Sequence, residues 1–276
     1  MTLIKGGSWS VSFEWITSEG DSIMNRYKKT VAALLMAAFA MSMLTGCKTE
    51  NNDDSKSLYS SETQESSKPL ESIVSLSEAK PGSTVRFGAY EQDNNTSNGK
   101  EDIEWIVLVR EDDRILVISR YALDCQPYNT AYSEVTWETC SLRKWLNGTF
   151  LNTAFSDEER GKIPSVTVSA DKNPSYDTSP GNNTKDQVFL LSITEANKYF
   201  SSDSARQCQG TAYCYYAQGA KKADNGNCWW WLRSPGYDPN NAAHVFINGK
   251  VITLGIDVYH GTDGVRPALW INIPVS

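Results

Sequence analysis

The chain has 276 residues, 40% of them hydrophobic and 21% charged, and its formal net charge is −7. At roughly 150 residues per domain, this length and apolar content predict one or two domains with a real core, while 18 glycines and 10 prolines exclude fibrous and fully disordered classes. Because acidic residues (33) outnumber basic ones (26), we expect no nucleic-acid partner and no basic patch for anionic lipid.

Residues 24–47 contain, in order, the parts of a bacterial export signal. A segment with Arg26 and two lysines precedes an apolar run, 31–40, that is too short to span a bilayer. The run Leu44-Thr45-Gly46-Cys47 resembles the bacterial lipobox, which implies cleavage before Cys47 and a diacylglycerol on its thiol. We therefore expect an exported, extracytoplasmic lipoprotein, with Cys47 as the lipidation site and the cell membrane as a partner. The alternative is a buried N-terminal helix.

Two polar segments flank the signal peptide, which is assigned to residues 24–46. Residues 1–23 are polar and unpatterned, so our hypothesis is that translation starts at Met24 and that these residues lie upstream of the true start. Residues 47–71 are rich in serine, glutamate and asparagine, and they have too few apolar side chains to fold alone, which predicts a flexible tether. Residues 72–276 are expected to form the globular domain.

The first two thirds of this domain mix strand and helix patterns. Runs rich in β-branched and aromatic residues predict strands over 84–90, 103–109 and 114–119, and a short apolar strand over 188–191. Leu142, Leu146 and Phe150 share one helical face, which predicts a helix within 138–150. Capping boxes at Ser156-Asp-Glu-Glu159 and Ser192-Ile-Thr-Glu195 predict two further short helices, ending near Gly161 and Phe200.

The last third consists of strands and turns. Strands are predicted over 229–233, 243–247, 251–255 and 264–271. Asn248-Gly249 between two apolar runs predicts a hairpin with a two-residue turn. Long polar loops cover 169–186 and 201–227, and loops of this length are usually functional or mobile. The predicted fold class is α+β, with a few helices on a mostly antiparallel sheet and much irregular loop.

Several blocks of this domain resemble a bacterial family of uncharacterised secreted domains. The most specific are Trp230-Trp-Leu-Arg-Ser-Pro-Gly236 and Gly264-Val-Arg-Pro-Ala-Leu269, and the resemblance covers about residues 80–272. That family is similar to C-type-lectin-like folds, which include formylglycine-generating-enzyme domains and hypervariable receptor-binding proteins. The resemblance implies a C-type-lectin-like domain whose two chain ends lie together and whose C-terminal third faces a ligand.

Within these blocks, the physical interpretation is mainly structural. Trp230 and Trp231 point to opposite faces of a strand, so at least one of them is expected in the core. Arg233 and Arg266 stand beside apolar strands, and we expect each to be paired with an acid or bonded to carbonyls, not to clamp a ligand.

The variable content of the C-terminal third predicts a recognition surface. Tyrosine and asparagine with a few acids supply rigid contact area and adaptable hydrogen bonds, and exposed aromatic rings can stack on a sugar or anchor a protein. The predicted ligand-binding residues are Trp229, Tyr237, Asp238, Asn240, Asn241, His244, Asp257, Tyr259, His260 and Asp263. The alternative is an ordinary polar loop surface.

Metal and cofactor signals are weak. Asp93, Asn95, Ser97 and Glu104 have EF-hand ligand spacing, but Asn98 occupies the position that needs glycine, so a hairpin loop is predicted instead. The sugar-binding tripeptide of calcium-dependent lectins is also absent from the chain. We therefore expect no metal and no cofactor.

Five cysteines remain when Cys47 carries lipid. An odd number allows at most two disulfides, and we predict Cys125 with Cys140 and Cys208 with Cys228, leaving Cys214 free. No CxxC pair supports a zinc site.

Three functions stay open at this point. The first is a non-catalytic, membrane-anchored binding domain for a glycan, a peptide or a surface protein. The second is an exported thiol-dependent modifying enzyme of the formylglycine-generating-enzyme type, although the residues around Cys208 and Cys214 do not match that enzyme's motif. The third is a structural envelope domain without a small ligand.

Overall fold

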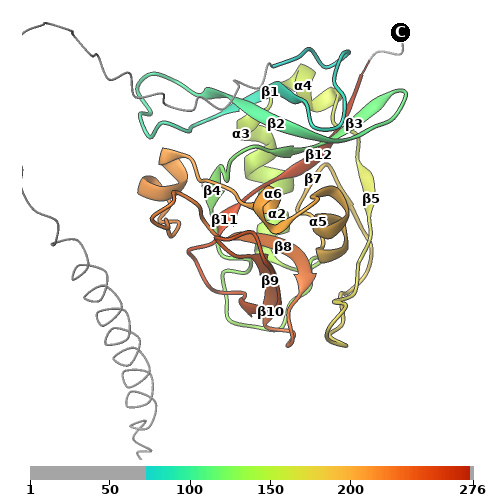
Figure 1. Cartoon of the computed structure of the whole chain (residues 1–276), viewed down its shortest axis with the longest axis vertical. Helices are drawn as coiled ribbons and strands as arrows, with labels where there is room; N and C mark the ends of the chain where they lie inside the picture. The colour runs from blue at the N-terminus through green and yellow to red at the C-terminus, as the bar shows by residue number, and fades with distance from the viewer. Residues whose placement is uncertain (1–72, 274–276) are drawn as a thin grey trace, which may run out of the picture. The chain divides into compact units, whose positions relative to one another are not determined.

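The computed structural model describes residues 73–273, and the predicted signal peptide, lipidated Cys47 and tether lie outside these residues. Two five-stranded sheets organise the described domain (Figure 1). Their strands are β1 (Thr84–Tyr90), β2 (Glu101–Arg110), β3 (Arg114–Ser119), β4 (Asp124–Cys125), β7 (Val188–Phe189), β8 (Trp230–Pro235), β9 (Asn241–Val245), β10 (Val251–Asp257), β11 (Gly264–Val265) and β12 (Ala268–Asn272). A separate two-stranded sheet pairs β5 (Val166–Val168) with β6 (Thr184–Asp186).

The predicted α+β class with mostly antiparallel strands is confirmed. The first sheet has the order β1-β2-β3-β12-β7 and is antiparallel throughout. The second has the order β10-β9-β8-β11-β4, and only its β8–β11 pair is parallel. Because β11 and β12 follow each other along the chain, residues 264–272 form one segment that belongs to both sheets.

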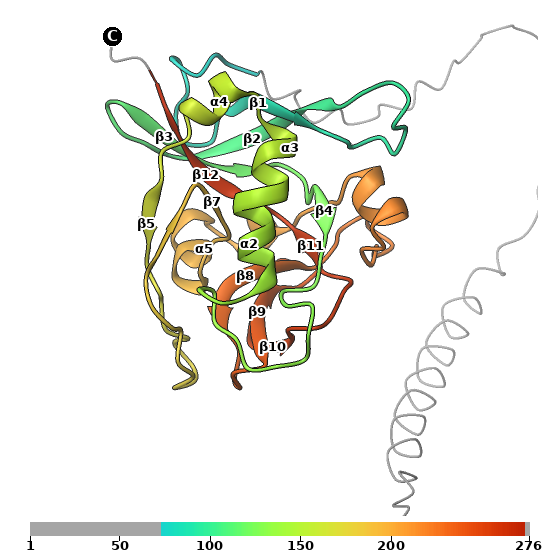
Figure 2. The ribbon, with the colours of Figure 1, turned by 180° about the vertical axis from the view of Figure 1, so that it is seen from behind.

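The helices are short, and one composite helix connects the two sheets. The helical elements are α2 (Ser141–Trp145), the π-helical η1 (Leu146–Phe150), α3 (Leu151–Ala154), α4 (Asp157–Gly161), α5 (Ile193–Tyr199), α6 (Asp203–Arg206) and the π-helical η2 (Tyr213–Ala217). The first three run without a break from the second sheet to the first (Figure 2). Leu142, Leu146 and Phe150 are all buried on one face of this helix. The described residues contain no helix long and apolar enough to cross a membrane.

Local signals fix most element boundaries. Both predicted capping boxes form: Ser156 and Glu159 exchange backbone and side-chain hydrogen bonds before α4, and Ser192 and Glu195 do the same before α5. The predicted β9–β10 hairpin also forms, but its turn is longer than the two residues expected. The Phe246 N–H donates to Lys250 O at 2.9 Å, and the loop rests on α6, where a Cβ on Gly249 would lie 1.6 Å from Asp203 O. The close approach of Gly249 to Asp203 therefore leaves no room for a side chain at position 249 in this longer turn.

Tryptophans fill the core of both sheets. Trp105, Trp230 and Trp231 are fully buried, and each indole N–H donates to a backbone carbonyl, those of Phe87, Arg206 and Gln126 respectively. The two adjacent tryptophans of β8 are buried because both faces of this central strand are covered.

The two ends of the described chain lie on the first sheet. Val74 N–H donates to Thr84 O in β1, and Ile273 N–H donates to Asp113 O beside β3. Both ends therefore emerge at one end of the domain, whereas β9, β10 and their loops form the opposite end (Figures 1 and 2).

Candidate functional site

The predicted recognition residues divide into exposed and buried groups. Tyr237 is 47% exposed and Tyr259 60% exposed, and Asp257 also faces solvent, while Asp238 and Asn240 are half-buried. Asn241, His244 and Asp263 are buried, so placing them on the ligand-facing surface was wrong. The prediction assumed that one face of β9 is open, but β9 lies between β8 and β10 and all five of its residues are buried.

The exposed group is larger than the sequence indicated. Tyr132 and Tyr176, from loops distant in sequence, join Tyr237: Asn240 donates to the Tyr132 hydroxyl at 2.5 Å, and the Tyr176 and Tyr237 rings lie 6.2 Å apart, nearly edge to face. We call the group of exposed apolar and aromatic residues here the tyrosine surface. It consists of Tyr132, Tyr176, Tyr237, Leu254 and Tyr259.

Backbone hydrogen bonds hold the loops of the tyrosine surface in place. Tyr237 N–H donates to Leu254 O at 2.9 Å, and Val258 N–H donates to Asn240 O at 2.9 Å. Thr178 reaches from the loop before β6 and donates to Tyr237 O at 2.7 Å. Hydrogen bonds thus join three chain segments, around Thr178, Tyr237 and Leu254, and these segments carry rings of the tyrosine surface.

Polar groups lie between these rings. The hydrogen bond to Asp238 and the negative charge of that carboxylate raise the pKa of Tyr237, so its hydroxyl stays protonated and can act as a donor. Asp257 and Asn240 add further carboxylate and amide groups at the same place. The surface therefore offers apolar ring faces next to hydrogen-bonding groups.

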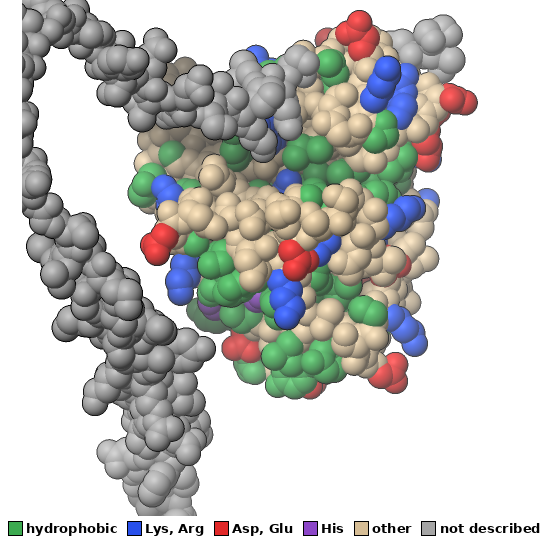
Figure 3. All heavy atoms as spheres, viewed as in Figure 1, with side chains coloured by type: hydrophobic (Ala, Val, Ile, Leu, Met, Phe, Trp, Pro, Cys, Tyr) green, Lys and Arg blue, Asp and Glu red, His purple; other side chains and the backbone are tan. Residues whose placement is uncertain are grey.

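A second cluster surrounds the buried His244 and Asp263 and adds three partly exposed rings. We call it the histidine cluster: Trp229, His244, Phe246, His260 and Asp263. The fully buried Asp263 lies between the two histidines, with carboxylate oxygens 3.2 Å from His244 Nδ1 and 3.1 Å from His260 Nδ1. The Trp229 ring stacks on His244 at 6.0 Å and on Phe246 at 5.4 Å. Histidine atoms reach the surface beside hydrophobic side chains (Figure 3).

Asp263 and His260 of this cluster shift each other's pKa. The hydrogen bond to Asp263 raises the pKa of His260 above its ordinary value. Burial acts to raise the pKa of Asp263, but the two histidine rings beside its carboxylate oxygens outweigh burial and lower it. A buried carboxylate between two imidazoles is accordingly held as an anion. Within this cluster His244 is buried, whereas Trp229 and His260 are partly exposed.

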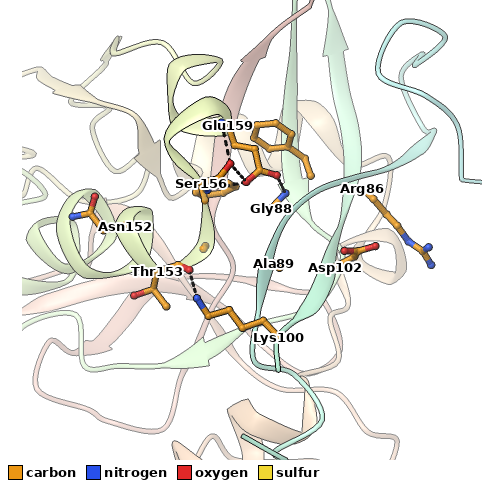
Figure 4. Close-up of a pocket in the computed structure, with 12 residues that line it drawn as sticks. Arg86, Gly88, Ala89, Lys100, Asp102, Asn152, Thr153, Ser156 and Glu159 are labelled. Carbon is orange, nitrogen blue, oxygen red and sulfur yellow. Dashed lines mark hydrogen bonds between the residues drawn. The ribbon is translucent and has the colours of Figure 1, made fainter. Parts of the chain in front are cut away.

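Three cavities open elsewhere on the domain, and none is lined by a predicted recognition residue. The first, about 550 Å³, lies between β1 and α3–α4 (Figure 4). Two of its charged groups bond to the backbone: Lys100 Nζ donates to Thr153 O at 2.5 Å, and Glu159 accepts from Gly88 N–H at 3.1 Å.

The second cavity, about 540 Å³, lies beside the β1–β2 loop. Asp93, with EF-hand-like spacing in the sequence, accepts hydrogen bonds from Asn95 and Asn98 within a hairpin loop, as predicted. Oxygens of Glu91, Asp93 and Glu101 lie within 4.8 Å of one another, but Glu101 accepts the N–H groups of Gln92 and Asp93. The carboxylates of this loop therefore already accept hydrogen bonds from backbone N–H groups of the loop itself.

The third cavity, about 460 Å³, lies beside α6 and is lined by Cys208, Arg266 and Arg120 among others. All five described cysteines are free and buried, so the predicted disulfides are not present. The Cys125–Cys140 pairing fails because the two thiols bond elsewhere: Cys125 Sγ donates to Gly261 O, whereas Cys140 Sγ accepts from Arg143 N–H at the start of α2. Cys208 and Cys228 are neighbours with free thiols.

The two arginines of the specific motifs differ in their surroundings. Arg233 donates to Leu190 O and pairs with Glu195 and Asp171. Arg266 donates through Nε to Ser119 O at 2.9 Å, while its Nη1 has no hydrogen-bond partner among the described residues.

Comparison with known proteins gives one match. The model of a family described as a domain of unknown function, DUF6273, matches residues 112–273, which is more than half of the chain. No curated protein and no solved structure matches the chain.

Proposed function

We propose a function for this chain, which belongs to the DUF6273 family. Its domain is a ligand-binding module, and its tyrosine surface contacts an extracellular glycan without making or breaking covalent bonds. The observation that carries the proposal is the gathering of four exposed tyrosines, from loops far apart in sequence, on one hydrogen-bonded framework. Scattered exposed aromatic residues need no explanation, but a clustered set suggests an interaction site.

The chemistry of the surface suits a sugar. Tyrosine rings offer flat apolar faces to the C–H faces of a pyranose, and they order few rotatable bonds when they bind. Asp238, Asp257 and Asn240 supply the carboxylate and amide groups that hydroxyl groups require.

A second candidate ligand is a surface protein. Tyrosine and asparagine together are also the preferred residues of protein-binding loops. The neighbouring edge strand β10 carries the 49% exposed Leu254, which adds apolar contact area.

We extend the proposal to the setting of the domain. A C-type-lectin-like arrangement is supported by chain ends on one sheet and a C-terminal third that supplies most of the tyrosine surface. Export and anchoring through Cys47 are supported by the sequence of residues 24–47.

Binding of the full chain to a glycan array, followed by titration with the best oligosaccharide, tests the proposal. We expect Tyr237→Ala and Tyr259→Ala each to weaken binding by about tenfold, because a stacked ring contributes on the order of 1 kcal/mol or more. Tyr216→Ala is the matched control: Tyr216 is 71% exposed but lies on η2, outside the tyrosine surface, so its removal leaves affinity unchanged.

Two outcomes overturn the glycan proposal. One is an array without any ligand, and the other is a ligand whose affinity the tyrosine variants leave unchanged. Binding that appears only on a protein array, and that Tyr237→Ala weakens, moves the assignment to the second candidate.

A further inference from the structure

The third cavity is lined by Cys208, and the fully buried Cys228 lies on the neighbouring chain segment. Gln209 and Asn227 form an antiparallel bridge, and Cys228 N–H donates to Cys208 O at 2.9 Å. Cys208 and Cys228 are therefore directly opposite each other as a hydrogen-bonded pair, for which Cα atoms are about 5.5 Å apart. This spacing falls within the range of about 4.4–6.8 Å that a disulfide spans.

Arg266 lies next to this pair as a buried cation. The side chain is 1% exposed, and its guanidinium lies between the rings of Phe200 and Trp230, 5.2 and 5.0 Å from their centroids. Among residues 73–273, no carboxylate forms an ion pair with it. Since a buried charge without a counter-charge is destabilising, the site favours an anion close to Arg266.

The sulfur of Cys208 is the group that can supply this anion. Burial alone raises the pKa of Cys208, but the hydrogen bond from the Cys228 thiol and the charge of Arg266 lower it to about 7. The same hydrogen bond and burial raise the pKa of Cys228 well above its ordinary value. The pair is therefore asymmetric: the Cys208 thiol, which donates to Arg120 O and Gln209 O when protonated, is the sulfur of the two that ionises more readily.

The remaining described thiols have no such surroundings. Burial raises the pKa of Cys125 and of Cys140 to about 12, and it raises the pKa of Cys214 as well. None of these three lines the cavity at Cys208. They serve as internal controls in the same molecule.

We propose that Cys208 and Cys228 form a redox-active dithiol that exchanges with disulfides of small thiols or peptides entering the cavity beside α6. The proposal rests on the cross-strand geometry, the cavity and the unpaired Arg266, and it does not depend on the tyrosine surface. Cys208 is the attacking thiol, Cys228 is the resolving thiol, and Arg266 is a positioning residue that holds the anion.

The exchange balances with the substrate disulfide as oxidant. The Cys208 thiolate attacks one sulfur of R–S–S–R, whose S–S bond breaks, so that a mixed disulfide forms and one thiolate leaves. This thiolate takes the proton of Cys228, which then attacks Cys208 Sγ and releases the second thiolate, protonated by water. The dithiol becomes a disulfide, and R–S–S–R becomes two thiols. A thiol reductant of the same class returns the pair to the dithiol.

Oxidised glutathione is the probe for a test on the reduced, natively folded full chain. Peptide mass spectrometry of the wild-type chain is expected to find a Cys208–Cys228 disulfide, and of Cys228→Ser a glutathione adduct on Cys208. The Cys208 adduct should form at least tenfold faster than adducts on Cys125, Cys140 or Cys214, with a rate midpoint near pH 7. Arg266→Lys should keep that midpoint, whereas Arg266→Gln should move it upward.

Circular dichroism first establishes that each variant is folded, and Cys214→Ser is the matched control that leaves the exchange unchanged. Equal modification of Cys208 and the three control thiols overturns the proposal. So does a Cys208–Cys228 disulfide that dithiothreitol cannot reduce in the folded chain, because such a bond is structural. If neither Arg266 variant folds, the rate and pH midpoint of Cys228→Ser alone decide.

Discussion

Two charged residues in the interior, Asp263 and Arg233, each have their own partners nearby. Asp263 is fully buried, yet two histidines keep it ionised, and Arg233 is 3% exposed but is surrounded by Glu195, Asp171 and backbone carbonyls. Breaking one member of such a group leaves the other charged and without a partner, which costs more than the group contributes to the free energy of folding.

The His260–Asp263 pair predicts a pH dependence of the free energy of unfolding. The pKa of His260 is raised above its ordinary value of 6.5, so its contribution is complete below that pH and is lost as pH rises through the folded-state pKa. The pKa of Asp263 is lowered below 3.8, so its contribution is complete above that pH and is lost as pH falls through the folded-state value. Both contributions are present together between these two ordinary values.

Urea unfolding of the wild-type chain and of His260→Gln at several pH values measures this effect. We expect the difference in free energy of unfolding to be largest near about pH 5 and to shrink above the folded-state pKa of His260. A difference that stays constant, or that grows from pH 6 to pH 9, would contradict the assignment of Asp263 as the partner of His260.

At the scale of elements, two capping boxes with one sequence pattern have different energetic roles. Glu159 caps α4 at a half-exposed position, and it also accepts from Gly88 N–H. Glu195 belongs to the capping box of α5. Its carboxylate also accepts hydrogen bonds from two guanidinium nitrogens of the buried Arg233 in β8. The second box therefore joins a helix to the core of the second sheet.

Replacing each glutamate with alanine tests this difference. We expect Glu159→Ala to lower the free energy of unfolding by about 0.3–1.5 kcal/mol, as the loss of a cap does. Glu195→Ala should lower it by about 3–5 kcal/mol, because Arg233 loses its main carboxylate while it remains buried. Denaturant titrations of both variants give the comparison, and equal losses would show that the ion pair adds nothing to the cap.

The elements show which features the sequence can predict. Capping boxes, alternating strands and the apolar helix face are local patterns, and the structure has them at Ser156, at Ser192, in β1 and β3, and along α2–η1–α3. The burial of His244 and Asp263 depends on neighbouring strands, which no local pattern reveals. Tyr132 and Tyr176 were missed for the same reason, since only the folded chain brings their loops to Tyr237.

At the scale of the whole domain, the segment 264–272 couples the two sheets. Its first part pairs with β4 and β8, and its second part pairs with β3 and β7. Neither sheet can lose this segment without disturbing the other, so we expect one cooperative unfolding transition.

Coincident transitions would verify this coupling. Far-ultraviolet circular dichroism reports on all strands, and tryptophan fluorescence reports on Trp105 and Trp270 in the first sheet and on Trp230 and Trp231 in the second. When both Trp105 and Trp270 are replaced with phenylalanine, the fluorescence transition should still coincide with the circular dichroism transition. Two separated midpoints would mean that the sheets unfold independently.

The position of the chain ends has a consequence for access. Whatever precedes Ile73 joins the domain beside β1, at the far end from the loops around β10 (Figure 1). If residues 47–71 form the predicted tether, they join the domain at the end away from the tyrosine surface. Under the proposed function, changing the length of this segment is then expected to change the distance over which the domain can meet a glycan, but not its affinity for that glycan.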